Sequence, residues 1–425
     1  MRALRTCTFV IIYLSFLLPA GFAQQVLTWQ QLRDRFERSN PTLRSGEISI
    51  AESRAQEVTA YLKPNPQGAL VLDQVGNTES GTAFSAANVI SSLNYLHERQ
   101  GKRELRRDSA QKGTTITEWS VADQQRTLLF NLRGAFVQTL QAKAILDLAR
   151  QNLEYYDQVL RVNRDRFQAG DISQVDLNRL ELQRVQYESD VVTSGTSLRT
   201  AKIQLLMLLN DRTPVDQFDV AGPFDFLEQI APPDEFRTMA LNERPDLRAA
   251  VEAINKAKID YRLAVANGSA DPTFSLDVGV PSISQAFLSF QPPLRQYVGV
   301  GVSVPLRIFD RNQGEKLRTH LDIGRNEKVR DATLAQVFSD VDSAYATLTS
   351  NVSLLKAYKE KYLTQSLQVR ETIDFSFQQG AASLLDFLNA QNDYRTTQRA
   401  YLTLIGSYLT AAAQLNLAVG REVIP

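Results

Sequence analysis

The sequence has little of the material that most enzymes and metalloproteins use. Its 425 residues include one cysteine, Cys7, and two histidines, His97 and His320, which stand far apart. Neither a metal site nor a catalytic site built on histidine is therefore predicted. The formal net charge is zero, which gives no electrostatic footprint for nucleic acid as a partner. We find no nucleophile beside a base, no metal-ligand spacing and no phosphate loop, so we predict no enzyme activity and no cofactor.

Long apolar runs are also missing, apart from one at the start of the chain. Arg2 and Arg5 precede an apolar run over residues 9–18, and small residues follow it. This pattern predicts a secretory signal peptide over residues 1–23, with an N-terminal anchor as the alternative. Because Cys7 lies in this segment, the exported chain would contain no disulfide. Helix hydropathy alone then describes a soluble exported protein, since no other stretch has about 18 uninterrupted apolar residues.

One ten-residue pattern occurs twice, 210 positions apart. Residues 167–176 read FQAGDISQVD, and residues 377–386 read FQQGAASLLD. The glycines, Gly170 and Gly380, each follow a long helical pattern and are predicted to end it in the left-handed conformation. The serine three residues later is predicted to cap the next helix. Each copy is therefore predicted to be the tight tip of a helical hairpin, and docking of a partner or gating of a pore is compatible with that shape.

The stretches that flank these tips repeat with the heptad of a coiled coil. Apolar and small residues alternate steps of three and four over residues 132–167 and 177–208, and again over 337–362 and 387–415. We call each such stripe a seam. The helix expected over residues 102–167 would be on the order of 100 Å long, more than a single globular core needs.

Four short strands are predicted between the helices, over residues 69–75, 87–96, 273–280 and 297–309. In the last two, apolar residues alternate with small or polar ones, which is the weak signature of a membrane barrel strand. A half-buried sheet packed on helices is the alternative. Four strands alone cannot close a barrel in lipid, but three copies of the chain would supply twelve.

The two halves of the chain share one plan of helix, two strands, long helix, tip and long helix, which indicates a tandem duplication. We predict a first repeat over residues 24–233, which ends in a proline-rich loop, and a second repeat over 234–425. The expected fold class is mainly α with a small membrane β part. Duplicated helical hairpins and four strands per chain would trimerise into a twelve-stranded β-barrel on an α-helical barrel.

This pattern resembles the TolC-like outer membrane efflux family, the exit ducts of Gram-negative tripartite pumps and type I secretion systems. The resemblance rests on the duplicated tips, on the Pro-x-Leu-Arg helix starts at Pro41 and Pro245, and on the Gln-Gly helix restarts at Gly101 and Gly314.

The resemblance implies a homotrimer in the outer membrane that extends into the periplasm and passively conducts substrates outward. Its partners would be a periplasmic adaptor, an inner-membrane transporter and outer membrane lipid. The alternative function is a soluble periplasmic coiled-coil scaffold or adaptor, which leaves the four strands unexplained.

The resemblance also implies roles for the tip residues. An acidic ring at the pore entrance would correspond to Asp386, with Asn389 beside it and Asp176 as its first-repeat counterpart; the alternative is that Asp386 only caps a helix. The family's Arg lock is not expected, because Ala382 stands in its place. Phe377 also replaces a Tyr able to form a hydrogen bond. The residues expected at the adaptor-docking tips are Phe167, Gly170, Ser173, Phe377, Gly380 and Ser383.

A basic cluster follows the second strand. It is predicted to be a solvated helix start near the inner side of the membrane, with a ligand-binding patch as the alternative. Its members are Arg99, Lys102, Arg103, Arg106 and Arg107.

Overall fold

The computed structural model describes residues 25–73, 88–280 and 296–424, so the predicted signal peptide lies outside the described residues. The chain divides into two compact units. The first unit comprises Met1–Phe36 with Gln138–Pro223, and the second comprises Glu37–Val137 with Phe224–Pro425. Helix α3 (Lys102–Ala169) contributes its first part to the second unit and its last part to the first.

The first unit is a helical hairpin with a small parallel ribbon at its base. The last part of α3 packs along α4 (Gln174–Leu208), while β1 (Gln25–Leu27) pairs with β4 (Phe218–Val220), and α1 (Trp29–Ser39) follows β1. A short 3₁₀ turn, Val215–Gln217, leads into β4.

The seam predicted for this hairpin forms as expected. Tyr156 and Tyr187 stack at 4.4 Å between ring centroids, and the Tyr156 hydroxyl donates to the Leu180 carbonyl at 2.9 Å. The residues on the heptad positions are buried or half-buried along its whole length, because steps of three and four keep them on one side of each helix. The fully buried members include Thr139, Leu180 and Leu205.

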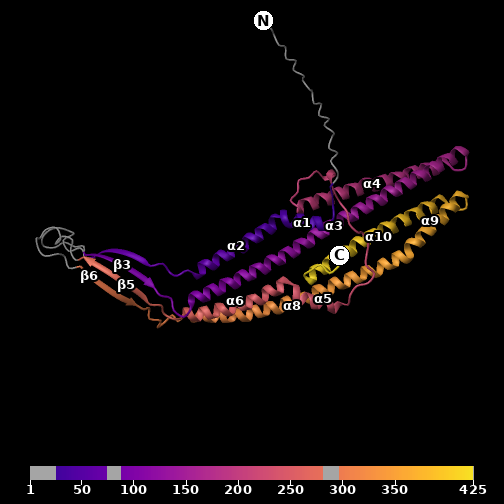
Figure 1. Ribbon diagram of the computed structural model, residues 1–425. Coiled ribbons are helices and arrows are strands. Elements are labelled where there is room, and N and C mark those ends of the chain that lie inside the picture. Colours follow the sequence, from indigo (N-terminus) through magenta and orange to yellow (C-terminus); the bar gives the residue numbers. More distant parts are fainter. Residues whose placement is uncertain (1–24, 74–87, 281–295, 425) are drawn as a thin grey trace, which may run out of the picture. The chain divides into compact units, whose positions relative to one another are not determined.

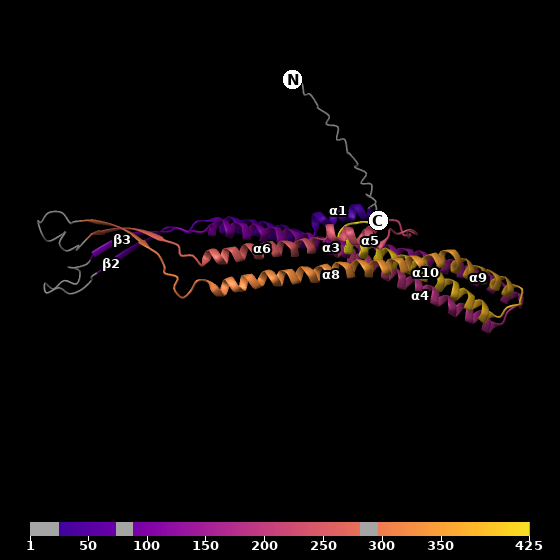
Figure 2. The same ribbon diagram turned by 90° about the horizontal axis from the view of Figure 1, so that it is seen from below.

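The second unit contains the remaining helices and the four-stranded sheet (Figure 1). Helix α2 starts at Pro41 because the Asn40 side chain accepts hydrogen bonds from the Thr42 and Leu43 amides, at 2.9 and 3.1 Å. Helices α6 and α8 lie side by side in both views (Figures 1 and 2). The helices are α2 (Pro41–Tyr61), the first part of α3, α5 (Pro233–Glu243), α6 (Pro245–Asn267), α8 (Gln313–Ala357), α9 (Leu363–Gln378) and α10 (Leu384–Val419).

The core of the second unit lies where α5, α8 and α10 meet. It is built around Leu348, Leu355, Tyr408 and Leu415, all at most 2% exposed. Among the described residues, α10 alone is long and apolar enough to cross a membrane by length and composition. More than half of its most apolar stretch is buried, as in the core helix of a folded protein.

The sheet is antiparallel throughout, in the order β2-β3-β5-β6. The last strand ends earlier than the predicted 297–309, because the chain turns out of the ladder before Pro305, which has no amide hydrogen to donate. The strands are β2 (Gln67–Asp73), β3 (Asn88–Leu96), β5 (Thr273–Val280) and β6 (Tyr297–Ser303).

Both tips have the predicted local structure. Gly170 and Gly380 have φ of 87° and 73°, which is the left-handed region that favours glycine. The hydroxyls of Ser173 and Ser383 each accept a hydrogen bond at 3.1 Å from the amide three residues later. The chain reversal at each tip is therefore held by interactions within a few residues of the turn.

A π-helical turn over Tyr358–Tyr362 joins α8 to α9. Before this turn, seam residues stand 209 positions after their first-repeat counterparts, as Leu348 does after Thr139. After it the difference is 210, as between Phe377 and Phe167. The turn thus absorbs one extra residue and keeps the buried stripes of α8 and α9 on the same side.

The π-turn also corrects the predicted seam at one position. An unbroken heptad would bury Tyr362, but the widened turn rotates it outward, and it is 45% exposed. It packs edge-on against Tyr358, with ring centroids 5.4 Å apart.

Deleting Lys361, an exposed residue of the π-turn, is expected to produce a continuous α-helix with an unbroken seam. The variant should fold, and its melting temperature by circular dichroism should stay level or rise. The matched control is deletion of Gln151, an exposed position of the uninterrupted α3, which rotates the following seam by about 100° and should lower the melting temperature. Equal losses in the two deletions would contradict this account of the turn.

Candidate functional site

The four-stranded sheet has one apolar face and one polar face. Strand register places Leu93 opposite Leu276, and Leu276 opposite Val300, so these side chains share a face. Val300 is 84% exposed, although it is a large apolar residue in a regular strand. The same face carries Leu70, Leu72, Val89, Tyr95, Phe274, Val278, Val298 and Val302.

The opposite face is small and polar over most of β5 and β6, although Val71, Ile90, Leu96 and Tyr297 also lie on it. The register places Ser275 beside Gly301, and Asp277 beside Gly299. Further members of this face are Gln67, Ser92, Asn94, Thr273 and Ser303. Such a face suits water, whereas the apolar face does not.

Within the part of the second unit that the structure describes, no helix lies on either face of the sheet (Figures 1 and 2). The large side chains of the apolar face are accordingly exposed, including Leu70, Leu276 and Val300. The alternative of a half-buried sheet packed on helices is therefore wrong for this chain.

The sheet is joined to the helices by a buried ion pair. The Lys102 ammonium, 4% exposed, donates to the Asp271 carboxylate at 2.6 Å and to the Ser269 carbonyl at 3.0 Å. The other Asp271 oxygen accepts the Arg99 amide at 3.0 Å. Burial alone would raise the pKa of Asp271, but the hydrogen bonds from Lys102 and the Arg99 amide, together with the nearby positive charges, outweigh it and hold that pKa below its ordinary value. This pair ties the start of α3 to the turn that precedes β5.

The predicted solvated helix start is therefore wrong for two of its members. Lys102 is buried against Asp271, and Arg106 pairs with Glu98. Arg103 and Arg107 lie over the Tyr61 ring, at 4.2 and 5.0 Å from its centroid. Asp271 and Tyr61 come from distant segments of the chain, and Glu98 lies eight positions before Arg106, so no helical spacing predicts these partners.

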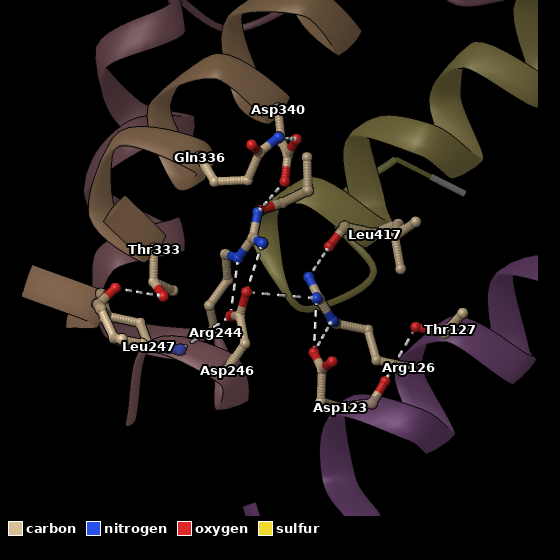
Figure 3. A network of polar contacts seen from close by, with 12 residues as sticks. Asp123, Arg126, Thr127, Arg244, Asp246, Leu247, Thr333, Gln336, Asp340 and Leu417 are labelled. Carbon is tan, nitrogen blue, oxygen red and sulfur yellow. Dashed lines mark hydrogen bonds and ion pairs between the residues drawn. The ribbon is translucent and has the colours of Figure 1, made fainter. Parts of the chain in front are cut away.

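A second polar network joins four helices of the second unit (Figure 3). The Arg244 guanidinium holds Asp246 through two hydrogen bonds, at 3.0 and 2.6 Å, and reaches Asp340 of α8 at 2.8 Å. Arg126 of α3 pairs with Asp123 at 2.6 Å and lies 4.0 Å from Asp246.

Both guanidiniums also reach the end of α10. Arg126 donates to the Leu417 carbonyl, and Arg244 donates to the Ala418 carbonyl at 3.3 Å. Carbonyl groups in the last turn of a helix have no partner within it, and positive charge there interacts favourably with the helix dipole. We call this set of contacts the arginine clamp; it fixes the end of α10 against α3, α6 and α8.

The arginine clamp is expected to weaken in acid. Burial would raise the pKa of Asp246, but the hydrogen bonds from Arg244 and the charge of Arg126 outweigh it and hold that pKa below its ordinary value. Its contribution to stability is then complete above the unfolded pKa of about 3.9 and is lost as the pH falls through the lower folded pKa.

Melting temperatures measured from pH 7 to pH 3 should therefore fall below about pH 4. Asp246→Asn should cost about 1–3 kcal/mol at pH 7 and flatten the acid limb. Asp393→Asn, at an exposed carboxylate of α10, is the control and should leave the curve unchanged. An acid limb of the same steepness in both variants would contradict this assignment.

The candidate gate residues lie at the starts of α4 and α10. Asp386 is exposed and forms a capping box, in which its carboxylate accepts from the Ser383 hydroxyl at 2.7 Å and from the Ser383 amide at 3.3 Å. Asn389, almost one turn further, is also exposed. Asp176 accepts from the Ser173 hydroxyl at 2.8 Å in the first unit. Asp386 thus caps its helix and still presents its side chain to solvent.

The tip residues differ in accessibility. Phe377 is buried and stacks on Phe387, with ring centroids 4.8 Å apart and planes at 22°. Gly170 and Gly380 are exposed, as is Ser383. At the second tip, a partner would therefore touch the turn around Gly380, and the stacked rings would stiffen that turn from inside.

The second half of the chain is similar to a known protein family. A protein-family model described as "Outer membrane efflux protein" matches residues 237–421, which span α6, both strands of the second half, the second tip and α10. This part of the chain, less than half of its length, is similar to the family. The outer membrane efflux proteins are channels and not enzymes, and they lie in the outer membrane and extend into the periplasm.

Two curated relatives match this chain over nearly its whole length. The cobalt-zinc-cadmium resistance protein CzcC of Cupriavidus metallidurans is 24% identical, over 90% of this chain and 87% of its own. Outer membrane protein TolC of Escherichia coli K12 is 20% identical, over 94% and 84%. Both relatives therefore extend across the two predicted repeats.

Solved structures show the same fold. A structure of CusC superposes with a TM-score of 0.77 at 18% identity, covering 92% of each chain. The structure of VceC from Vibrio cholerae superposes with a TM-score of 0.74 at 14% identity, covering 92% of this chain and 96% of its own.

Proposed function

We propose that three copies of this chain close a twelve-stranded barrel and act as a passive exit duct for efflux across the outer membrane. The observation that carries the proposal is the sheet, which has an exposed apolar face and two unpaired edge strands, β2 and β6. In lipid every backbone N–H and C=O needs a protein partner, so these edges have to pair with those of other copies. The polar face would then line a water-filled lumen.

The outer side of α4 supports a helical barrel below the β-barrel. A second stripe of large apolar residues runs along it at heptad spacing, on the side away from the hairpin seam. Each member is at least 50% exposed: Val175, Leu182, Val185, Val192 and Ile203. A helix with two opposite seams suits a position between two neighbours, as in a tube of side-by-side hairpins. A soluble periplasmic scaffold, the alternative function, would explain this stripe but not the apolar sheet.

The cargo and the energy source would both come from partners. A periplasmic adaptor would dock at the two tips, and an inner-membrane transporter would drive transport. Relatives are named for cobalt-zinc-cadmium resistance and for pyoverdine export, so one duct type serves unlike substrates. Within residues 25–73, 88–280 and 296–424, no group of three or more His, Cys, Asp or Glu side chains is arranged to hold a metal ion.

A pair of arginine substitutions tests the barrel. Val300→Arg places a charge on the apolar face, which costs about 2–4 kcal/mol at the middle of a bilayer, whereas Ser275→Arg places it on the polar face. Val300→Arg should reduce the amount of trimer in the outer membrane fraction, measured by native mass in detergent. Ser275→Arg should leave the amount unchanged. A soluble wild-type monomer in the periplasm, or equal loss in both variants, would refute the barrel.

We also propose that Asp386, Asn389 and Asp176 line the entrance of the duct. Asp386→Asn removes the charge but keeps an oxygen that can accept the Ser383 amide, so the helix cap is largely retained. In planar bilayers this variant should conduct with a lower preference for cations. Asp216→Asn, at an exposed carboxylate outside both tips, is the control and should not change selectivity. An unchanged reversal potential for Asp386→Asn would remove Asp386 from the entrance.

A further inference from the structure

The loop that follows β6 exposes several large apolar side chains close together. Over residues 304–309, Leu306 is 81% exposed, Ile308 is 59% exposed and Phe309 is 90% exposed. Scattered apolar side chains on a surface need no explanation, but three within four residues form a patch that indicates an interaction.

The loop is held at both ends. Its first end continues from Ser303, which pairs with Thr273 in the sheet. Just past its other end, the Asn312 side chain donates to the Ala264 carbonyl of α6 at 2.8 Å, with Asn312 itself in the left-handed region. The apolar side chains are therefore presented outward by a braced loop and do not fold back onto the same copy.

A second exposed apolar patch lies where α2 leads into β2. Val58 and Leu62 are 65% and 60% exposed, and Tyr61, whose ring Arg103 and Arg107 partly cover, is 40% exposed. β2 starts at the helix end of the sheet, and β6 finishes at that same end, because one strand follows α2 and the other precedes α8. β2 and β6 are also the two edges of the sheet. Each patch thus lies at the helix end of an unpaired edge.

The two connections at the inner strands are different in character. Residues 97–101, after β3, and residues 268–272, before β5, contain no large apolar residue. They are tied to each other by the Lys102–Asp271 pair and by the hydrogen bond from the Arg99 amide. Exposed apolar residues therefore gather at the two connections that belong to edge strands, and the inner connections are closed within one copy.

We propose that residues 304–309 of one copy pack on the α2–β2 connection, residues 58–66, of a second copy of this chain. The proposal rests on the barrel proposed above, in which β6 of one copy pairs antiparallel with β2 of the next. That pairing brings the two patches to the same end of the same subunit boundary. The contact would bury apolar side chains between two copies at the place where the strands end and the helices begin.

Photo-cross-linking locates the partner of the loop. A benzoylphenylalanine placed at Phe309 is irradiated in outer membranes that contain the full-length chain, and the cross-linked peptides are identified by mass spectrometry. The expected product joins position 309 to residues 58–66 of another copy and migrates as a covalent oligomer. Adducts to lipid alone, or to residues of the same copy, in membranes that contain the trimer would overturn the proposal.

Two substitutions provide an independent measurement. Phe309→Ser should lower the temperature at which the trimer dissociates in detergent, whereas Arg307→Gln, in the same loop, should not. Unchanged dissociation for Phe309→Ser would overturn the subunit contact while leaving the duct intact. A wild-type chain that forms no trimer would refute the duct itself, so the two failures are distinguishable.

Discussion

The need to satisfy every backbone hydrogen bond governs this molecule. The sheet of one copy is complete in its interior, where β3 and β5 pair on both sides, and incomplete at β2 and β6. With its large apolar side chains facing outward, such a sheet suits neither water nor lipid as an isolated piece. In the proposed barrel, the edge strands and the apolar connections beside them would meet those of neighbouring copies.

The two predicted repeats begin their corresponding helices with different local chemistry. At the start of α2, Asn40 caps the helix with its own side chain. At the start of α6, the corresponding Arg244 provides no cap, and it carries a buried charge into the arginine clamp. A motif that repeats in the sequence can therefore serve a local purpose in one half and a long-range one in the other.

The features that the sequence predicted correctly are those that depend on the local periodicity of apolar residues. The seams, the tips at Gly170 and Gly380, and the strand alternation depend on residues a few positions apart, so their patterns are visible in a single chain. The Lys102–Asp271 pair and the clamp between Arg244 and Asp340 join residues about 100 or more positions apart. Charged residues of that kind are common on helix surfaces, and nothing local separates a buried one from a solvated one. The π-turn was not predicted for another reason: a single extra residue hardly changes the heptad pattern of apolar residues.

The second tip has a mechanical consequence. Its glycine turn, its capping box and the stacked rings of Phe377 and Phe387 all lie within one hairpin, so a displacement of α9 and α10 together breaks none of them. The contacts that such a displacement would have to break lie toward the far end of α10, where its apolar residues pack in the core and where Arg126 and Arg244 donate to its last carbonyls. The α9–α10 hairpin would therefore move as one rigid piece, and the resistance to its movement would depend on the contacts at the C-terminal end of α10.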